Sequence, residues 1–202
     1  MKVVFLGPPG AGKGTQAERM AAIFGARHAS TGEIFRRAAA AGTELGETVK
    51  GYLDSGALVP DELTSRVVGE MVVEREQSYI LDGYPRTLQQ GRDLEGMLQA
   101  RDESLDGVLY FDLPEELAVE RLTGRLVCPE CGANYHRKFM PPEEDGVCDR
   151  CGGELKVRSD SSEEVVRERL EQFRRKTLPL VGFYEGRGLL ERVDAAPSPE
   201  EV

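Results

Sequence analysis

The sequence predicts an α/β fold in which helices flank a parallel sheet, with one helical insert and one small β-rich insert. Short apolar segments alternate with longer helical segments along most of the 202 residues, and this order is typical of a parallel sheet with crossover helices. Between residues 127 and 157 the composition changes to Cys, Gly and Pro. That change indicates a compact β-rich insert rather than another strand and helix of the sheet.

The expected elements end at glycines, prolines and capping residues. Residues 2–6 are mostly apolar and β-branched, which predicts a strand that is buried on both faces. A Gly-rich segment separates this strand from a helix at 16–24, and residues 30–59 form the helical insert. The further elements, in chain order, are helices at 32–41, 45–53 and 61–76, a strand at 79–82, a helix at 87–99, a strand at 108–112, a helix at 114–124, a long helix after Ser161 and a strand at 189–193.

The long helix is expected to begin at Ser161, because Ser161 and Glu164 have the spacing of a capping box. Pro179 is expected to kink the helix near its end, since proline donates no N–H and its ring clashes with the preceding turn. The residues of the buried face are spaced three or four apart and are Val166, Leu170, Phe173, Thr177 and Leu180. Residues 195–202 are expected to form a polar tail.

The composition argues against several classes of protein. Lys and Arg total 26 against 36 Asp and Glu, and a net charge of -10 disfavours binding to duplex nucleic acid or anionic lipid. Hydrophobic residues make up 40%, and no apolar run approaches the length of a membrane span. The apolar stretch at 3–6 is too short for the core of a signal peptide. We therefore expect a cytoplasmic protein that binds neither nucleic acid nor membranes.

The segment between the first strand and its helix has the spacing of a phosphate-binding loop, with Gly7, Gly12 and Lys13 in place. Its glycines let backbone N–H groups converge on phosphate oxygens, and the following helix adds positive potential at its N-terminus. Lys13 is expected to reach the outer phosphates. Gly14 separates Lys13 from Thr15, whereas the general motif has Ser or Thr directly after the lysine. A Gly-rich turn without a ligand is the alternative.

All four cysteines lie in the β-rich insert as two CxxC pairs that are separated by 16 residues. They are Cys128, Cys131, Cys148 and Cys151. This spacing is typical of a structural zinc site with four thiolate ligands, which would stabilise an insert too small to form its own core. Since four thiolates complete tetrahedral zinc, His28 and His136 are not expected as ligands. Two disulfides are the alternative.

Together these motifs resemble those of the adenylate kinases, members of the nucleoside monophosphate kinase family, and in particular bacterial forms with a zinc-binding lid. The resemblance covers residues 1 to 200. It rests on GPPGAGKGT at 7–15, STGE at 30–33 with Arg36, LDGYPRT at 81–87 with Gln90, Gly124 and Arg125, and Arg158 with Arg169. It implies a core at 1–29, 60–123 and 162–202 that contains the phosphate-binding loop, an insert at 30–59 that binds the nucleoside monophosphate, and a zinc-binding lid at 124–161.

The resemblance also implies reversible phosphoryl transfer from MgATP to AMP, giving two ADP, by a monomer whose lid closes over both nucleotides. The implied catalytic residues are Lys13, Arg86, Arg125, Arg158 and Arg169. The implied ATP-binding residues are Gly10, Ala11, Gly12, Lys13, Gly14, Thr15, Arg121, Arg125, Asn134 and Tyr135. The implied AMP-binding residues are Thr31, Arg36, Ala57, Leu58, Val59, Gly83, Tyr84, Pro85, Arg86, Gln90, Arg158 and Arg169.

Two of these roles also have a physical basis in the sequence. Asp82 ends an apolar strand, where its carboxylate can orient water molecules on Mg²⁺. The Gln90 amide can donate and accept hydrogen bonds at the edge of adenine. A turn aspartate, a surface glutamine and solvated arginines are the alternatives. In the lid, Asp160 is followed by Ser161 where relatives carry two acidic residues, so the lid charge is expected to differ.

Two other functions fit parts of the sequence. A kinase that uses GTP as donor, or UMP or CMP as acceptor, would share the same motifs, although Thr31 and Gln90 favour AMP. A zinc-ribbon module that binds nucleic acid or protein could use the phosphate-binding loop as a regulatory nucleotide sensor. The acidic composition and the lack of a basic or aromatic stripe around the cysteines argue against the module.

Overall fold

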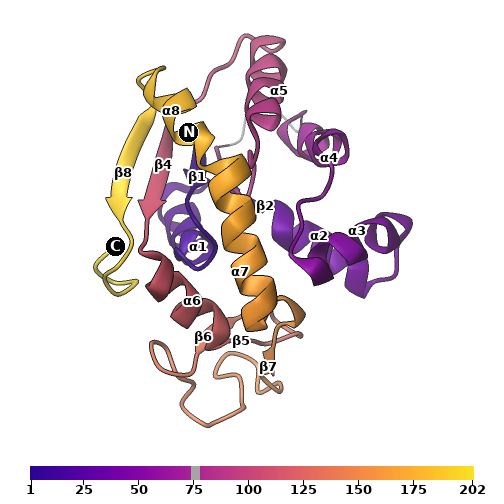
Figure 1. Ribbon diagram of the computed structural model, residues 1–202, viewed down its shortest axis with the longest axis vertical. Helices are drawn as coiled ribbons and strands as arrows, with labels where there is room; N and C mark the ends of the chain where they lie inside the picture. The colour runs from indigo at the N-terminus through magenta and orange to yellow at the C-terminus, as the bar shows by residue number, and fades with distance from the viewer. Residues whose placement is uncertain (74–77) are drawn as a thin grey trace.

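The computed structural model describes residues 1–73 and 78–202, and it confirms the α/β fold with a central parallel sheet (Figure 1). The sheet has five strands in the order β2-β3-β1-β4-β8, and each neighbouring pair is parallel. Its strands are β1 (Lys2–Leu6), β2 (Arg27–Ser30), β3 (Tyr79–Asp82), β4 (Gly107–Asp112) and β8 (Leu190–Asp194). Because all strands run in one direction, the loops after them meet at one edge of the sheet.

Helices cover both faces of the sheet, and β1 shows why. Val4 and Leu6 point into one hydrophobic cluster, whereas Val3 and Phe5 point into the other. The first cluster packs against α4 (Asp61–Val73), α5 (Leu88–Gln99) and α8 (Pro179–Glu185). The second packs against α1 (Lys13–Phe24), α6 (Glu115–Thr123) and α7 (Glu163–Gln172). The predicted end of α4, at residue 76, lies outside the described residues.

Strand β2 was not predicted from the sequence. Of its four residues only Ala29 is fully buried, and its neighbours Arg27, His28 and Ser30 give no apolar run. The strand lies at the edge of the sheet, where it pairs with β3 alone. Its pairing therefore comes from backbone hydrogen bonds to β3 and not from a hydrophobic pattern that a sequence could display.

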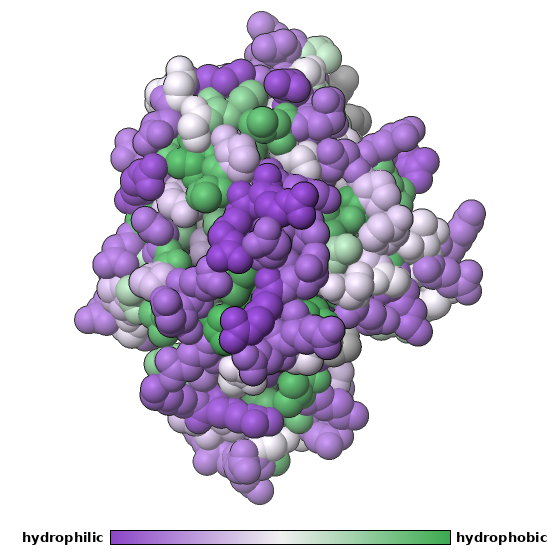
Figure 2. Space-filling model, in the orientation of Figure 1, coloured by the Kyte–Doolittle hydropathy of each residue, from purple (hydrophilic) through white to green (hydrophobic). Residues whose placement is uncertain are grey.

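The predicted capping box at Ser161 is wrong. Ser162 caps α7 instead, and its side chain accepts the N–H of Val165 at 3.4 Å. Ser161 is buried at the end of a short 3-10 helix, η1 (Ser159–Ser161), which follows the β-rich insert. The outward face of α7, at the centre of Figure 2, is hydrophilic, as its exposed Glu and Arg residues require.

The distortion expected from Pro179 takes the form of a π-helical turn, η2 (Phe173–Thr177). The N–H of Leu178 bonds to the carbonyl of Phe173 at 2.8 Å, five residues back. Pro179 then occupies the first position of α8, where its missing N–H costs no hydrogen bond. The long predicted helix is therefore two α-helices joined by a wide turn.

The helical insert consists of α2 (Thr31–Ala40) and α3 (Glu44–Ser55), which pack against each other. Gly46 allows the close approach, because a Cβ atom there would lie 2.1 Å from the carbonyl oxygen of Ala38. A small hydrophobic cluster fills the space between these helices and α4. Its buried members are Phe35, Val49 and Val59.

The β-rich insert forms a three-stranded antiparallel sheet with β5 (Arg125–Val127) between β6 (Asn134–His136) and β7 (Lys156–Val157). It has a hydrophobic cluster of its own, which includes Leu126, Tyr135 and Leu155. Figure 1 places this insert at the foot of α6 and α7, on the side of the molecule away from α5. Among the helices of the described residues, none is both long and apolar enough to cross a membrane.

Candidate nucleotide-binding and phosphoryl-transfer site

A cavity of about 1270 Å³ opens at the carboxyl ends of the sheet strands, where both inserts meet the core. Its walls come from the Gly-rich loop after β1, the loop after β3, α2, the lid, α7 and the chain after β8. Open α/β sheets bind ligands at this edge. The predicted site residues on its wall are Gly10, Ala11, Gly12, Lys13, Gly14, Thr15, Arg36, Leu58, Asp82, Gly83, Pro85, Arg86, Arg121, Arg125, Asn134, Tyr135, Arg158 and Arg169.

The Gly-rich loop curls around the ammonium group of Lys13. Lys13 Nζ donates hydrogen bonds to the carbonyl oxygens of Gly7 and Pro8, both at 2.8 Å. Gly7 has a φ of 146°, and a Cβ atom there would lie 2.6 Å from the carbonyl oxygen of Phe111. Burial lowers the pKa of Lys13 to about 8, although the nearby Asp82 carboxylate opposes that shift. The ammonium therefore keeps its charge at neutral pH.

Asp82 ends β3 directly beside this loop, as predicted, and faces His28 on β2. The Nε2 atom of His28 lies 3.5 Å from Asp82 Oδ2, and both side chains are mostly buried. Burial alone would raise the pKa of Asp82, but His28 and Lys13 hold it below its ordinary value. The carboxylate is therefore ionised at the cavity wall. An oxygen ligand of this kind fits Mg²⁺.

Three arginines gather around Asp160, which lies in η1 directly after the β-rich insert. The Asp160 carboxylate lies 2.5 Å from Arg158, 3.0 Å from Arg169 and 3.8 Å from Arg125. Burial would raise the pKa of Asp160, but Arg169, Arg158 and Arg125 lower it to about 2. In the described part of the chain, Nε and Nη2 of Arg125 are buried without a hydrogen-bond partner. We call Arg125, Arg158 and Arg169 the arginine cluster.

The cluster carries more positive charge than its one carboxylate balances. The pKa of Arg169 is lowered to about 10, mainly by burial; the charges of Arg158 and Arg86 also lower it, and Asp160 opposes them. Burial likewise lowers the pKa of Arg125 well below its ordinary value, with Arg158 and Arg169 adding to the effect. Charge that is both desolvated and repelled by its neighbours is stabilised by an incoming anion.

Arg86 follows β3 and is anchored by the backbone. Its Nε donates to the carbonyl of Gly83 at 2.8 Å, and the hydroxyl of Thr31 donates to the same carbonyl at 2.9 Å. The Thr177 hydroxyl donates to the carbonyl of Arg86 at 2.9 Å. Burial lowers the pKa of Arg86, whereas Asp82 and Asp160 raise it. These contacts fix the guanidinium between the Gly-rich loop and the arginine cluster.

Several predicted AMP-binding residues lie behind the cavity wall and not on its surface. They are Thr31, Ala57, Val59, Tyr84 and Gln90. Tyr84 is fully buried, and its hydroxyl bonds to the carbonyl of Gln90 at 3.1 Å. Gln90 is 1% exposed, and its amide contacts Asp61 and the backbone of Arg86. These residues therefore support the cavity wall from behind. Of the predicted AMP-binding residues before Gly83, Arg36 and Leu58 lie on the cavity surface.

The chain after β8 lines the cavity. From the sequence we expected only a polar tail at 195–202, and this role was not predicted. Arg121 donates hydrogen bonds to the carbonyl oxygens of Ala195, Ala196 and Pro197 at 2.7 to 3.0 Å. The carbonyl of Pro199 accepts a hydrogen bond from Gln16 on α1 at 2.7 Å. This segment directly follows a strand that the sequence predicts. Its position after a parallel strand is the signal that could have placed it at the same edge of the sheet as the Gly-rich loop.

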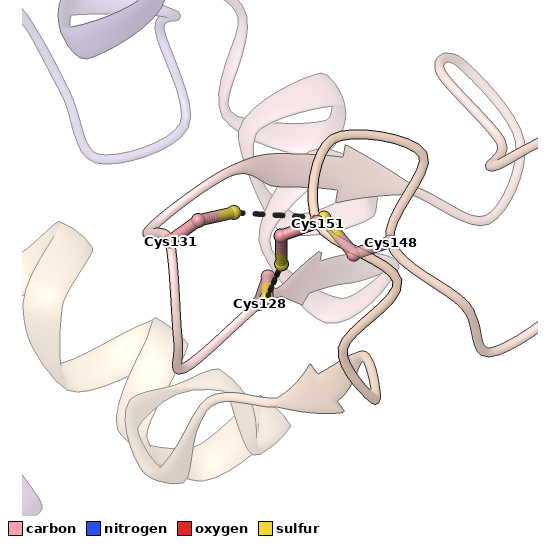
Figure 3. Close-up of side chains that lie close together, drawn as sticks. All are labelled: Cys128, Cys131, Cys148 and Cys151. Atoms are coloured by element: carbon pink, nitrogen blue, oxygen red, sulfur yellow. Dashed lines mark hydrogen bonds between the residues drawn. The ribbon is translucent and has the colours of Figure 1, made fainter.

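The four cysteines of the lid point toward one another from two turns (Figure 3). The Sγ atoms of Cys128 and Cys151 are 3.4 Å apart, those of Cys131 and Cys148 are 3.6 Å apart, and all four lie within 4.8 Å of one another. Tetrahedral zinc with Zn–S bonds of about 2.3 Å requires S–S separations of about 3.8 Å, so the donor set fits the metal. His136 is not part of the cluster, and its Nδ1 accepts the N–H of Lys138 at 2.9 Å.

The parallel sheet, the Gly-rich loop and a cavity lined with cations define a nucleotide-binding phosphotransferase with a phosphate-binding loop. The family model for adenylate kinase matches residues 5–189. The chain is 46% identical to an adenylate kinase of Clostridium perfringens over 204 aligned positions, which cover 100% of this chain and 94% of that protein. It is 48% identical to the adenylate kinase of Carboxydothermus hydrogenoformans, with 100% and 95% covered, and 47% identical to that of Archaeoglobus fulgidus, with 100% and 94% covered. This chain belongs to the adenylate kinase family.

Proposed function

We propose that this chain transfers the terminal phosphoryl group of ATP to AMP reversibly, giving two ADP, and that both nucleotides bind end to end in the cavity. The convergence of Lys13, Arg86 and the arginine cluster on one cavity carries this proposal. The donor half consists of residues 10–15 with Arg121, Arg125, Asn134 and Tyr135. The acceptor half consists of Thr31, Arg36, residues 57–59, residues 83–86, Gln90, Arg158 and Arg169.

The reaction needs no protein nucleophile. An oxygen of the AMP phosphate forms a bond to the γ-phosphorus while the bond from that phosphorus to the β–γ bridging oxygen breaks, and its electron pair stays on the departing ADP. The acceptor oxygen is already anionic at neutral pH, so no general base is required. Catalysis then consists of positioning and of stabilising charge on the transferred group.

The chain's own cations supply that stabilisation. Lys13 is held over the Gly-rich loop, where it would contact the outer phosphates of the donor. Arg86 and the arginine cluster approach from the acceptor and lid sides. The family uses Mg²⁺ with ATP, and Mg²⁺ neutralises phosphate charge when bound; Asp82 would hold it through water molecules.

The division into a core, an acceptor insert at 30–59 and a lid at 124–161 explains how the cavity closes. The lid has a hydrophobic cluster of its own, which supports its movement as a unit. The cluster of the acceptor insert also includes Leu63 and Val67 of α4, so this insert would move against α4. Closing both inserts over the nucleotides would exclude water from the transferred group and so suppress hydrolysis of ATP.

Zinc bound by Cys128, Cys131, Cys148 and Cys151 would stabilise the lid without taking part in the reaction. The net charge of -10 supports a protein that binds free nucleotides and no nucleic acid. We further propose that the chain is a cytoplasmic monomer, which analytical ultracentrifugation of the purified protein and fractionation of the source cell would test.

A bisubstrate ligand, in which two adenosines are joined by a chain of phosphates, tests the two facing sites together. We expect one ligand to bind per chain in calorimetry and to be displaced by ATP and by AMP. Displacement by ATP alone would contradict a second nucleotide site. A coupled assay across GTP, UMP and CMP separates this function from kinases of other specificity.

A further inference from the structure

A network of hydrogen bonds holds the amide of Gln90, and it begins at Asp61, the first residue of α4. Asp61 Oδ1 accepts a hydrogen bond from Gln90 Nε2 at 2.8 Å, and Asp61 Oδ2 accepts one from Thr87 Oγ1 at 2.8 Å. Thr87 caps α5, and its Oγ1 accepts the backbone N–H of Gln90 at 3.1 Å. The Oε1 atom of Gln90 accepts the backbone N–H of Arg86 at 2.7 Å.

The chemistry of the two amide partners fixes which end of the amide faces which way. The carboxylate of Asp61 only accepts hydrogen bonds, and the backbone N–H of Arg86 only donates. The nitrogen of Gln90 must therefore face Asp61, and its oxygen must face Arg86. The side chain of Gln90 is 1% exposed, so water does not replace either partner. Without Asp61, a single hydrogen bond would oppose rotation of the amide by 180° about its last torsion.

We propose that Asp61 is a positioning residue that sets the base selectivity of the acceptor site through the amide of Gln90. This inference rests on the proposed function, in which Gln90 contacts the acceptor base. The network uses one of the two N–H groups and one of the two lone pairs of the amide. One donor and one acceptor remain for the base, which can reach them only where the wall in front of Gln90 opens, because Gln90 lies behind the cavity wall in this structure.

The direction of the amide decides which purine it matches. Adenine presents an amino donor beside a ring-nitrogen acceptor, whereas a 6-oxopurine such as hypoxanthine presents an acceptor beside an N–H donor. For a base bound in one fixed position, the amide orientation that Asp61 and Arg86 impose can pair with adenine. An amide rotated by 180° would instead pair with a 6-oxopurine in the same position. A hydrogen-bonding site discriminates strongly when a mismatch leaves buried polar groups unpaired.

The fold provides a matched control one turn further along α4. Ser65 Oγ donates to Asp93 Oδ2 on α5 at 2.6 Å, so Asp93 also links these two helices through a carboxylate. Asp93 accepts a second hydrogen bond from Gln89, and none of its described hydrogen bonds involves Gln90. Replacing either aspartate by asparagine removes one negative charge and preserves size. Only Asp61→Asn also removes the restriction on the Gln90 amide, because an asparagine amide can donate as well as accept.

The experiment compares kcat/KM for AMP and for inosine monophosphate, with ATP as donor, in the two variants and the unmodified protein. We expect Asp61→Asn to lower the ratio of AMP to inosine monophosphate by at least about tenfold, which is about 1.4 kcal/mol. The KM for ATP should stay unchanged. Asp93→Asn should leave the ratio unchanged, although its melting temperature falls. An unchanged ratio in Asp61→Asn, or an equal fall in both variants, overturns the inference.

A third variant, Gln90→Ala, separates this inference from the proposed function on which it rests. If Gln90→Ala keeps the selectivity for AMP, the assignment of Gln90 to the base is wrong. If Gln90→Ala loses selectivity and Asp61→Asn does not, only the role of Asp61 is wrong. When Asp61 acts through Gln90, adding Asp61→Asn to Gln90→Ala changes the ratio no further. A further tenfold fall in the double variant overturns the inference.

Discussion

Asp160 stabilises the folded chain by bringing three guanidinium groups together, and the variant Asp160→Asn tests the size of this effect. Arg169, Arg158 and Arg125 overcome the effect of burial and lower the pKa of Asp160 from 3.8 to about 2. One pKa unit corresponds to about 1.4 kcal/mol, so the ionised carboxylate contributes about 2 kcal/mol at neutral pH. The side chain is 14% exposed, so solvent screens this interaction only weakly.

The pH dependence of this contribution has a definite sign. Because the pKa is lower in the folded chain than in the unfolded chain, the contribution is complete above about pH 4 and is lost as the pH falls toward 2. Urea unfolding of the unmodified protein and of Asp160→Asn should therefore differ by about 2 kcal/mol at pH 7, and by the same amount at pH 5.

The exposed pair of Arg192 with Glu185 offers a control, since both side chains are more than half exposed. Surface ion pairs of this kind contribute about 0 to 1 kcal/mol, so Glu185→Gln should change the free energy of unfolding less than Asp160→Asn does. If the two variants destabilise the protein equally at pH 7, the pKa of Asp160 is not held down by the arginine cluster. A difference that vanishes between pH 7 and 5 would refute the reasoning as well.

Three further predictions follow from the site. Lys13→Met should abolish turnover and leave the melting temperature within a few degrees of the original, since in the described part of the chain the ammonium donates its hydrogen bonds to two loop carbonyls; normal turnover in a coupled assay would overturn its assignment. Cys148→Ser should lower the melting temperature clearly while the rate at 25 °C falls little. A rate loss of orders of magnitude at an unchanged melting temperature would rule out a purely structural metal. The pKa of Lys13 is about 8 and its charged form attracts phosphate, so the affinity for ATP should fall as the pH rises past 8 in titration calorimetry.

The sequence predicted the elements that carry a local signal. Strands β1, β3 and β4 have apolar runs that end at Gly or a polar residue, and their bounds agree with the predicted ones to within one residue. Strand β2 has no such run and was missed. Ser161 and Ser162 are adjacent candidates for one cap; Ser161 ends η1 and is buried, and Ser162 makes the cap. That burial is a tertiary effect which no local pattern displays.

The candidate site was predictable to the extent that its residues follow parallel strands. The Gly-rich loop, Asp82 and Arg86 meet because their strands β1 and β3 are neighbours with Phe5 opposite Asp82. The contact between Asp61 and Gln90 joins residues 29 positions apart on two helices, and no spacing rule connects them. Arg121 is bound by carbonyls about 75 positions away, after the last strand. Contacts of this kind depend on how the helices pack over the sheet.

A chain of net charge -10 can bind two polyanions because the charge of its cavity is set locally. Interactions between exposed charges fade over about 8 to 10 Å in physiological salt, whereas the arginine cluster is desolvated and acts at contact distance. Asp82 and Asp160 are the buried acids that act on these cations, one beside Lys13 and one within the cluster. Together they lower the repulsion enough for the cations to remain charged, yet they balance only part of the positive charge. The remainder is stabilised when phosphates arrive, so the free energy of nucleotide binding depends on these two carboxylates as well as on the cations.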